Sequence, residues 1–277
     1  MTQDERQQTA RRINRMPTLG LGTWKNDDQS QCAESVQTAL ETGYRHIDTA
    51  QIYRNEEGVG KGIAAADVPR EDVFLATKVW ISSLDEEGVT ETTKESLDRL
   101  DTDYLDLLYV HWPSRTYDAE ETLTAFKDLK NAGHIERIGV SNFEPEHLDE
   151  AREVIGDDVF ANQVEMHPLL QQEALREYCS EHDIELVAYS PLARGEVFDV
   201  PELTEVAEKH EVSEAQVSLA WLREKGVTPI PKATSAAHIE DNWAARDLTL
   251  DTEDVALIDS IEREERQIDP DFAPESW

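Results

Sequence analysis

Eight short apolar runs alternate with amphipathic stretches of helical periodicity, and this alternation constrains the fold more than any other feature of the chain. A run that is apolar throughout is typical of a parallel strand covered on both faces. Strands that alternate with helices are typical of a parallel α/β fold, and eight such units favour closure into a barrel. The predicted strands are residues 19–22, 44–47, 73–77, 105–110, 135–140, 160–164, 186–189 and 227–230.

The stretches between these runs predict the helices that would cover the sheet. An open doubly wound sheet is the alternative fold, but no Gly-rich dinucleotide fingerprint follows the first apolar run. We therefore expect an α/β protein with a (β/α)₈ TIM-barrel fold. Barrel helices are predicted at residues 30–41, 85–100, 119–132, 173–181 and 213–225, and extra helices at 201–210 and 251–262.

Length and composition indicate one folded unit. The chain has 277 residues, of which 39% are hydrophobic, and no Gly/Ser/Pro linker interrupts it. This length suits one large barrel. We expect a polar, mobile N-terminal tail over residues 1–12 and a single domain over residues 13–277.

The chain is strongly acidic, with 60 acidic and 26 basic residues and a formal net charge of −34. Such a charge opposes compaction at low ionic strength, whereas at molar salt the Debye length falls to about 3 Å and the repulsion is screened. The acids are spread along every predicted helix, which favours adaptation to a salt-rich cytoplasm over an acidic patch for one partner. The charge argues against nucleic acid and anionic membranes as partners, and it favours a monomer.

Other classes of protein are disfavoured by what the sequence lacks. Cys32 and Cys179 are far apart on predicted helices, so we expect small buried side chains rather than a disulfide or metal site. No apolar run approaches the roughly 18 residues of a membrane helix, and no hydrophobic region follows the N-terminus. No His-x-His pair or HExxH motif supports a metal-dependent hydrolase. We expect a cytoplasmic protein without a metal.

Four polar residues stand at or just after consecutive predicted strands: Asp48, Tyr53, Lys78 and His111. Barrel active sites lie at the carboxyl ends of the strands, so these side chains are expected to share one pocket. Together they could supply a proton donor, two groups that tune it and one that orients a carbonyl. A phenol beside an ammonium is a better proton donor than a free phenol. Singly, each residue is more often structural, but their combination favours catalysis.

Several motifs occur in one order along the chain from about Pro17 onwards. They are GLGTW at 20–24, GYRHIDTA at 43–50, NEEGVG at 55–60, VHWP at 110–113, GVSNF at 139–143, YSPL at 189–192 and IPK at 230–232. With them the sequence resembles the aldo-keto reductases, NADPH-dependent carbonyl reductases built on a (β/α)₈ barrel. It is most similar to short microbial members that reduce diketogluconate, methylglyoxal or similar compounds. The resemblance implies that Tyr53 is the general acid, Lys78 and Asp48 tune it, and His111 orients the carbonyl.

The same resemblance implies a site for the nicotinamide and diphosphate of the cofactor. It implies that Ser141, Asn142 and Gln163 hydrogen-bond the carboxamide and that Tyr189 stacks on the ring. Ser190 and Leu192 match the loop that holds the pyrophosphate. Arg194 stands where the family often has a small polar residue, so it either pairs with the diphosphate or is a solvated surface arginine.

The residues for the adenosine 2′-phosphate depart from the family pattern. Lys232 matches the usual phosphate contact, and Asp241 and Asn242 match the pair that holds adenine. His238 replaces an arginine, and an imidazole gives neither the fork of donors nor the permanent charge of a guanidinium. Thr234 offers a hydroxyl instead. We expect NADPH to be the cofactor, with weaker than usual discrimination against NADH.

Aromatic residues are expected to wall the substrate pocket. Trp24, Trp80 and Trp112 follow the first, third and fourth predicted strands. Residues 268–274 resemble the C-terminal loop that the family places over the active site. The loop 114–118 is short, which favours small aldehydes, ketones or keto-sugars. The alternative function is a nicotinamide-nucleotide-binding sensor or regulatory barrel with little turnover, because fold alone does not decide function.

Overall fold

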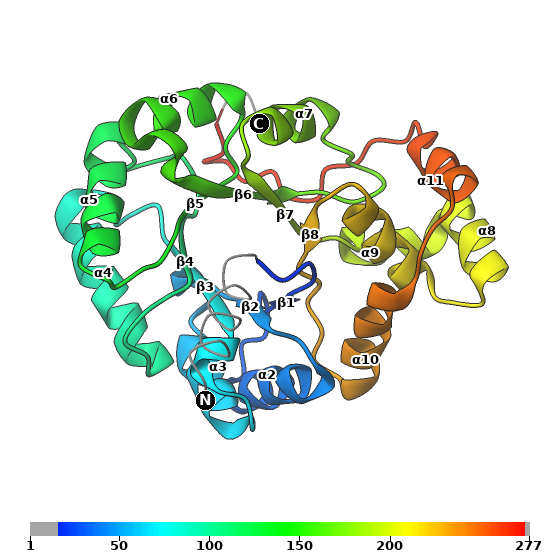
Figure 1. Ribbon diagram of the computed structural model, residues 1–277, viewed down its shortest axis with the longest axis horizontal. Helices are drawn as coiled ribbons and strands as arrows, with labels where there is room; N and C mark the ends of the chain where they lie inside the picture. The colour runs from blue at the N-terminus through cyan, green and yellow to red at the C-terminus, as the bar shows by residue number, and fades with distance from the viewer. Residues whose placement is uncertain (1–15, 275–277) are drawn as a thin grey trace, which may run out of the picture.

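The computed structural model describes residues 16–274, so the expected tail at residues 1–12 lies outside the described residues. Eight parallel strands pair in chain order from β1 to β8 (Figure 1), which confirms the predicted sheet. Helices surround the curled sheet on its outer side. The strands are β1 Leu21–Gly22, β2 His46–Asp48, β3 Phe74–Val79, β4 Leu107–Val110, β5 Ile138–Ser141, β6 Val159–Glu165, β7 Glu185–Tyr189 and β8 Thr228–Pro229.

Backbone hydrogen bonds join the first strand to the last. The amide of Gly20 donates to the carbonyl of Pro229 at 3.0 Å, and the amide of Gly22 donates to that of Pro231 at 3.1 Å. A side chain at Gly22 would not fit here, because its Cβ would lie 2.7 Å from the carbonyl oxygen of Ile230. Glycine therefore permits the close approach through which the sheet meets its own edge.

Several predicted strands begin too early, and four end one or two residues too early. β4 starts at Leu107 rather than residue 105, and β5 starts at Ile138 rather than residue 135. The reason is that an apolar run reports burial, whereas a strand also needs a paired ladder; Leu105 is fully buried without belonging to a strand. β3 runs on to Val79, so Lys78 lies within the strand and does not follow it.

The predicted helices are present, and α7 and α8 have the predicted limits. Asp28, Asp85 and Asp118 cap α2, α4 and α5 by accepting backbone N–H bonds of 2.8–3.0 Å. The last helix ends at Asp259, three residues before the predicted end, and the chain continues in extended form. The helices are α2 Gln29–Thr42, α3 Glu56–Ala65, α4 Glu86–Leu100, α5 Ala119–Asn131, α6 Pro145–Ile155, α7 Glu173–Glu181, α8 Pro201–His210, α9 Glu214–Glu224, α10 Ala236–Ala244 and α11 Thr252–Asp259.

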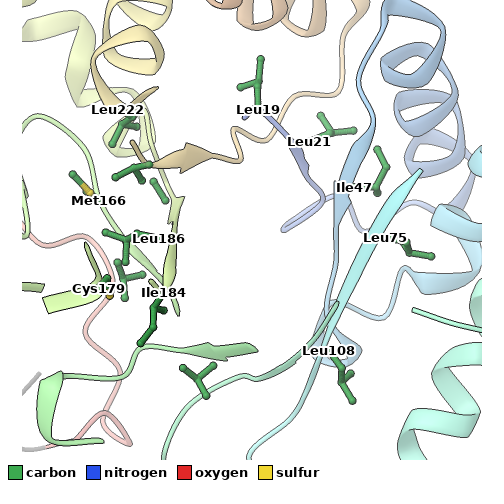
Figure 2. Packing of buried hydrophobic residues seen from close by; sticks show 14 of the residues in the cluster. Leu19, Leu21, Ile47, Leu75, Leu108, Met166, Cys179, Ile184, Leu186 and Leu222 are labelled. Carbon is green, nitrogen blue, oxygen red and sulfur yellow. The ribbon is translucent and has the colours of Figure 1, made fainter. Parts of the chain in front are cut away.

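Both faces of the sheet are buried, which explains why the strands lack polar alternation. Leu75 packs in the large cluster between strands and helices, part of which is shown in Figure 2. Its neighbours Phe74 and Ala76 belong to a second cluster of strand residues and Met16, which fills the inner side of the curled sheet. Cys32 and Cys179 are free and buried in the outer cluster, as expected. Across residues 16–274, no helix has the length and hydrophobicity to cross a membrane.

His46 is a buried histidine whose two ring nitrogens have no hydrogen-bond partner among the described residues. Its ring meets the ring of Phe74 edge-on, with centroids 5.1 Å apart. Burial, helped by the charge of Lys78, lowers the pKa of His46 to about 3. The folded protein therefore keeps this imidazole neutral in mildly acidic solution, whereas the unfolded chain protonates it.

His46 should make the protein lose stability in acid. The unfolded state takes up the proton below its pKa of about 6.5, so the free energy of unfolding should fall by up to about 1.4 kcal/mol per pH unit as the pH drops toward 4. We expect His46→Leu to show a shallower pH dependence than wild type in urea unfolding measured between pH 7 and pH 4. Parallel curves for wild type and His46→Leu would contradict this assignment.

Candidate active site

The strand ends bring the four predicted catalytic residues together at a pocket of about 570 Å³. Asp48 is the last residue of β2, and His111 directly follows β4. Tyr53 ends a short 3₁₀ turn, Gln51–Tyr53, in the loop after β2. These three line the pocket, and Lys78 is buried and touches Asp48.

Asp48 and Lys78 form a fully buried ion pair. The ammonium Nζ of Lys78 donates to Asp48 Oδ1 at 2.5 Å and to the carbonyl of Thr49 at 2.8 Å. The second carboxylate oxygen, Oδ2, accepts a bond from Gln163 Nε2 at 2.8 Å. Burial raises the pKa of Asp48 and lowers the pKa of Lys78, and their contact opposes both shifts. The ion pair thereby links β2 to β3, and the hydrogen bond from Gln163 links Asp48 to β6.

The hydroxyl of Tyr53 is held in its protonated form. Burial, and then the charge of Asp48, raise the pKa of Tyr53 well above its usual value. The sequence led us to expect the opposite influence, from Lys78. In the structure Nζ of Lys78 bonds to Asp48 and Thr49 and lies 5.2 Å from the centre of the Tyr53 ring. Burial therefore outweighs the ammonium at this position.

His111 is neutral and packed by aromatic rings. Burial, and then the charge of Lys78, lower the pKa of His111 well below its usual value. Its ring meets Tyr53 and Trp80 edge-on, at centroid distances of 5.9 and 5.1 Å. Asn142 Nδ2 donates to the backbone carbonyl of His111 at 3.0 Å and holds the loop after β4. The imidazole faces the pocket as a neutral group beside a phenol.

The residues expected to hold a nicotinamide are linked to one another along neighbouring strand ends. Ser141 Oγ donates to the carbonyl of Gln163 at 2.7 Å and accepts from Asn142 Nδ2 at 3.1 Å. The hydroxyl of Tyr189 donates to Asn142 Oδ1 at 2.8 Å. All four line the pocket.

Three cations line the mouth of this pocket in an otherwise acidic chain: Lys25, Arg194 and Lys232. The guanidinium of Arg194 and the ammonium of Lys25 lie 4.9 and 4.6 Å from the ring centre of Trp24. Sequence reasoning missed Lys25, for which adjacency to Trp24 was the available signal. Ser190 and Leu192, in the same loop as Arg194, also line the pocket.

The remaining residues of the predicted adenosine site do not line the pocket. Thr234 precedes α10, on which His238 is exposed and Asn242 is buried. The carboxylate of Asp241 accepts bonds from Ser213 Oγ at 2.7 Å and Gln216 Nε2 at 2.6 Å. It therefore ties α10 to the start of α9.

Aromatic side chains wall one side of the pocket. Trp24, Trp80 and Trp112 line it, and the ring of Phe272 meets both Trp80 and Trp112 at centroid distances of 5.6 Å. Ile52 and Phe198 also line the pocket, although they are exposed by 37% and 50%. Sequence reasoning missed these two, because a lone apolar residue in a loop resembles any other. In the described part of the chain, no group of three or more His, Cys, Asp or Glu side chains is placed to hold a metal.

Comparison with known proteins finds close similarity over most of the chain. Residues 18–263 match the Aldo/keto reductase family. Glyoxal reductase of Bacillus subtilis (strain 168) is 43% identical over 251 residues, which are 91% of either chain. Methylglyoxal reductase DkgB of Escherichia coli O157:H7 is 37% identical over 265 residues, or 95% of this chain and 99% of that protein.

The fold comparison agrees with the sequence comparison. The crystal structure of a putative 2,5-diketo-D-gluconic acid reductase B superposes with a TM-score of 0.89 and 36% identity. The match covers 94% of this chain and 93% of the other. With eight parallel strands and the strand-end residues in place, the chain is a carbonyl-reducing oxidoreductase and belongs to the aldo/keto reductase family.

Proposed function

We propose that this protein uses NADPH to reduce small aldehydes, dicarbonyls or keto-sugars to alcohols, with Tyr53 as the general acid. The observation that carries the proposal is the pocket itself. It joins a protonated phenol and a neutral imidazole at its base to three cations at its mouth. In a chain of net charge −34, such a cluster of cations suits a polyanionic ligand.

The residues around the pocket fit a nicotinamide dinucleotide. Ser141, Asn142 and Gln163 present hydroxyl and amide groups for a carboxamide, and Tyr189 offers a ring for stacking. Arg194 and Lys25 flank the mouth, where a diphosphate would be paired. When bound, this cofactor supplies the hydride, and the chain's own residues supply orientation and the proton.

Proton transfer follows from the states of the buried groups. As hydride reaches the carbonyl carbon, the carbonyl oxygen becomes negative and takes the hydroxyl proton of Tyr53. The ammonium of Lys78 then stabilises the phenolate left behind, while Asp48 holds the ammonium in place. His111, being neutral, can donate one N–H to the carbonyl oxygen and fix its direction.

The walls favour a small substrate. Phe272 and the two tryptophans that it contacts stand on the side of the pocket nearest His111. We propose that residues 268–274 form the C-terminal loop over the active site. The names of the relatives, glyoxal and methylglyoxal reductase, suggest two-carbon and three-carbon dicarbonyls as the first compounds to test.

Replacing the proposed acid should abolish turnover without abolishing cofactor binding. We expect Tyr53→Phe to lower kcat by about 100-fold or more, the range for loss of a general acid, because the alkoxide loses its proton donor. The assay follows oxidation of NADPH, and separately NADH, in multimolar KCl with methylglyoxal, glyceraldehyde and a keto-sugar. Tyr178→Phe, outside the pocket, is the matched control and should behave as wild type. An unchanged rate in Tyr53→Phe would exclude Tyr53 as the acid.

The sensor alternative requires binding without turnover. The relatives described above are named as reductases, which favours turnover. A folded wild-type protein that binds NADPH and turns over no carbonyl with either cofactor would restore that alternative.

Cofactor preference is proposed to depend on position 238. His238 is exposed on α10, and an arginine there would add a permanent charge and a fork of donors for the 2′-phosphate. We expect His238→Arg to raise the NADPH over NADH ratio of kcat/KM by about 10-fold. Ala237→Arg adds the same charge one residue away and should change the ratio less. Equal effects of both variants would mean that net charge, and not a specific contact, sets the preference.

We also propose that the acidic surface adapts this protein to high salt, as a cytoplasmic monomer with residues 13–277 as one domain. Repulsion among 60 acidic residues should weaken as salt screens it. We expect the melting temperature to rise by several degrees between 0.1 and 2 M KCl. Sucrose at equal osmolality controls for effects that are not electrostatic, and a melting temperature independent of KCl would refute the adaptation.

A further inference from the structure

The segment that follows α11 lies along the barrel without forming a helix or strand, and Figure 1 shows it running back beside β7 and β6. The amide of Glu265 donates to the carbonyl of Leu169 at 2.7 Å. Further on, Ser114 Oγ donates to the carbonyl of Phe272 at 2.8 Å. A segment near a chain end is ordered where such contacts hold it.

A third contact with this segment is made by Glu165, the last residue of β6. Its side chain is fully buried. Oε1 accepts the amide N–H of Gln267 at 2.7 Å, and Oε2 accepts that of Ile268 at 2.8 Å. Oε1 also lies 3.0 Å from Nε2 of the buried His167. A buried carboxylate is costly unless donors satisfy it, and here successive backbone amides of the C-terminal segment do so.

Glu165 stands at the rim of the active site. Side chains two residues apart on a strand face the same side, so Glu165 shares its face with Gln163, which lines the pocket. The proposed mechanism gives Glu165 no task, although it is buried beside the site. The residues whose amides donate to it, Gln267 and Ile268, are 102 and 103 residues further along the chain.

The segment that Glu165 holds becomes a wall of the pocket within a few residues. Ile268, Pro270 and Phe272 line the cavity. The ring of Phe272 lies 5.6 Å from that of Trp80, which lies 5.1 Å from the imidazole of His111. A shift of the segment at Gln267 would therefore reach the aromatic contacts beside His111.

We propose that Glu165 is a positioning residue for substrate recognition. Its carboxylate holds the amides of Gln267 and Ile268 and so keeps Phe272 against Trp80 and Trp112, where the wall limits the size of the substrate. Without these two hydrogen bonds, the segment would have to become ordered each time a substrate binds. The free energy of that ordering would raise KM rather than lower kcat. The kinetic part of this inference rests on the proposed reductase function.

The test is Glu165→Gln, which keeps the shape of the side chain and replaces one acceptor by an NH₂ donor. Hydrogen exchange should become faster in peptides covering residues 266–274 and stay unchanged in β2 and β3. With methylglyoxal, KM should rise about 10-fold, kcat should stay within about threefold, and NADPH binding should not change. Glu185→Gln, on the exposed start of β7, is the matched control and should match wild type in each measurement.

A double variant separates positioning from a general loss of stability. Phe272→Ala removes the wall directly and should raise KM and admit bulkier aldehydes. Adding Glu165→Gln to Phe272→Ala should then raise KM by less than twofold further, because the wall that Glu165 positions is already absent. Independent, multiplicative effects of the two substitutions would overturn the proposal.

Two results with Glu165→Gln would overturn parts of the proposal. Unchanged exchange in the 266–274 peptides of Glu165→Gln would overturn the anchoring, and faster exchange with unchanged KM would overturn the role in recognition. If Glu165→Gln does not fold, Gln267→Pro removes one of the donated N–H groups from the segment's side and must give the same changes in exchange and KM. If wild type shows no turnover, the proposed function fails, and hydrogen exchange still decides the anchoring.

Discussion

The site depends on the close approach of the first and last strands. The backbone amides of Gly20 and Gly22 donate hydrogen bonds to the carbonyls of Pro229 and Pro231, respectively. The absence of a side chain at Gly22 leaves room for the carbonyl of Ile230. A larger residue at Gly22 would push the two edges apart. Because the sheet meets itself, residues after β1, β2, β4, β7 and β8 line one pocket instead of standing along an open edge.

Four of the buried acids of this acidic protein hold distant parts of the chain together. Glu56 accepts bonds from Arg99 and Thr77 at 2.7 Å and fastens α3 to α4 and β3. Asp106 accepts from Arg70 and from the amide of Leu75, both at 3.0 Å. Asp48 binds the ammonium of Lys78. Glu165 binds the backbone amides of Gln267 and Ile268. Each is satisfied by donors from elements distant in sequence, as a buried carboxylate requires.

The pocket gathers positive charge in a chain whose net charge is strongly negative. The chain carries 60 acidic against 26 basic residues, a formal net charge of −34. Lys25, Arg194 and Lys232 gather at the mouth of the pocket, so an anionic ligand meets a local field opposite to that of the whole molecule. Deeper in, burial keeps Tyr53 protonated and His111 neutral, the states that the proposed proton transfer uses.

The sequence by itself determined the eight strands, most helices and the residues at the strand ends, because periodicity, caps and turns are local properties of the chain. It placed Asp48 and His111 at or just after a strand end, and it indicated an aromatic wall that includes Trp80 and Trp112. It could not tell that Lys78 lies within β3, nor which influence prevails on Tyr53, since burial there depends on surrounding strands.

Only the tertiary structure decided which distant groups meet. The amides of Gln267 and Ile268 reach Glu165 across about a hundred residues, and Asp241 bonds to Ser213 and Gln216 on another helix. No local pattern encodes such pairs, because they arise when the sheet curls and its covering segments pack. Which donor meets which acceptor then depends on the packing of segments that are distant in the sequence.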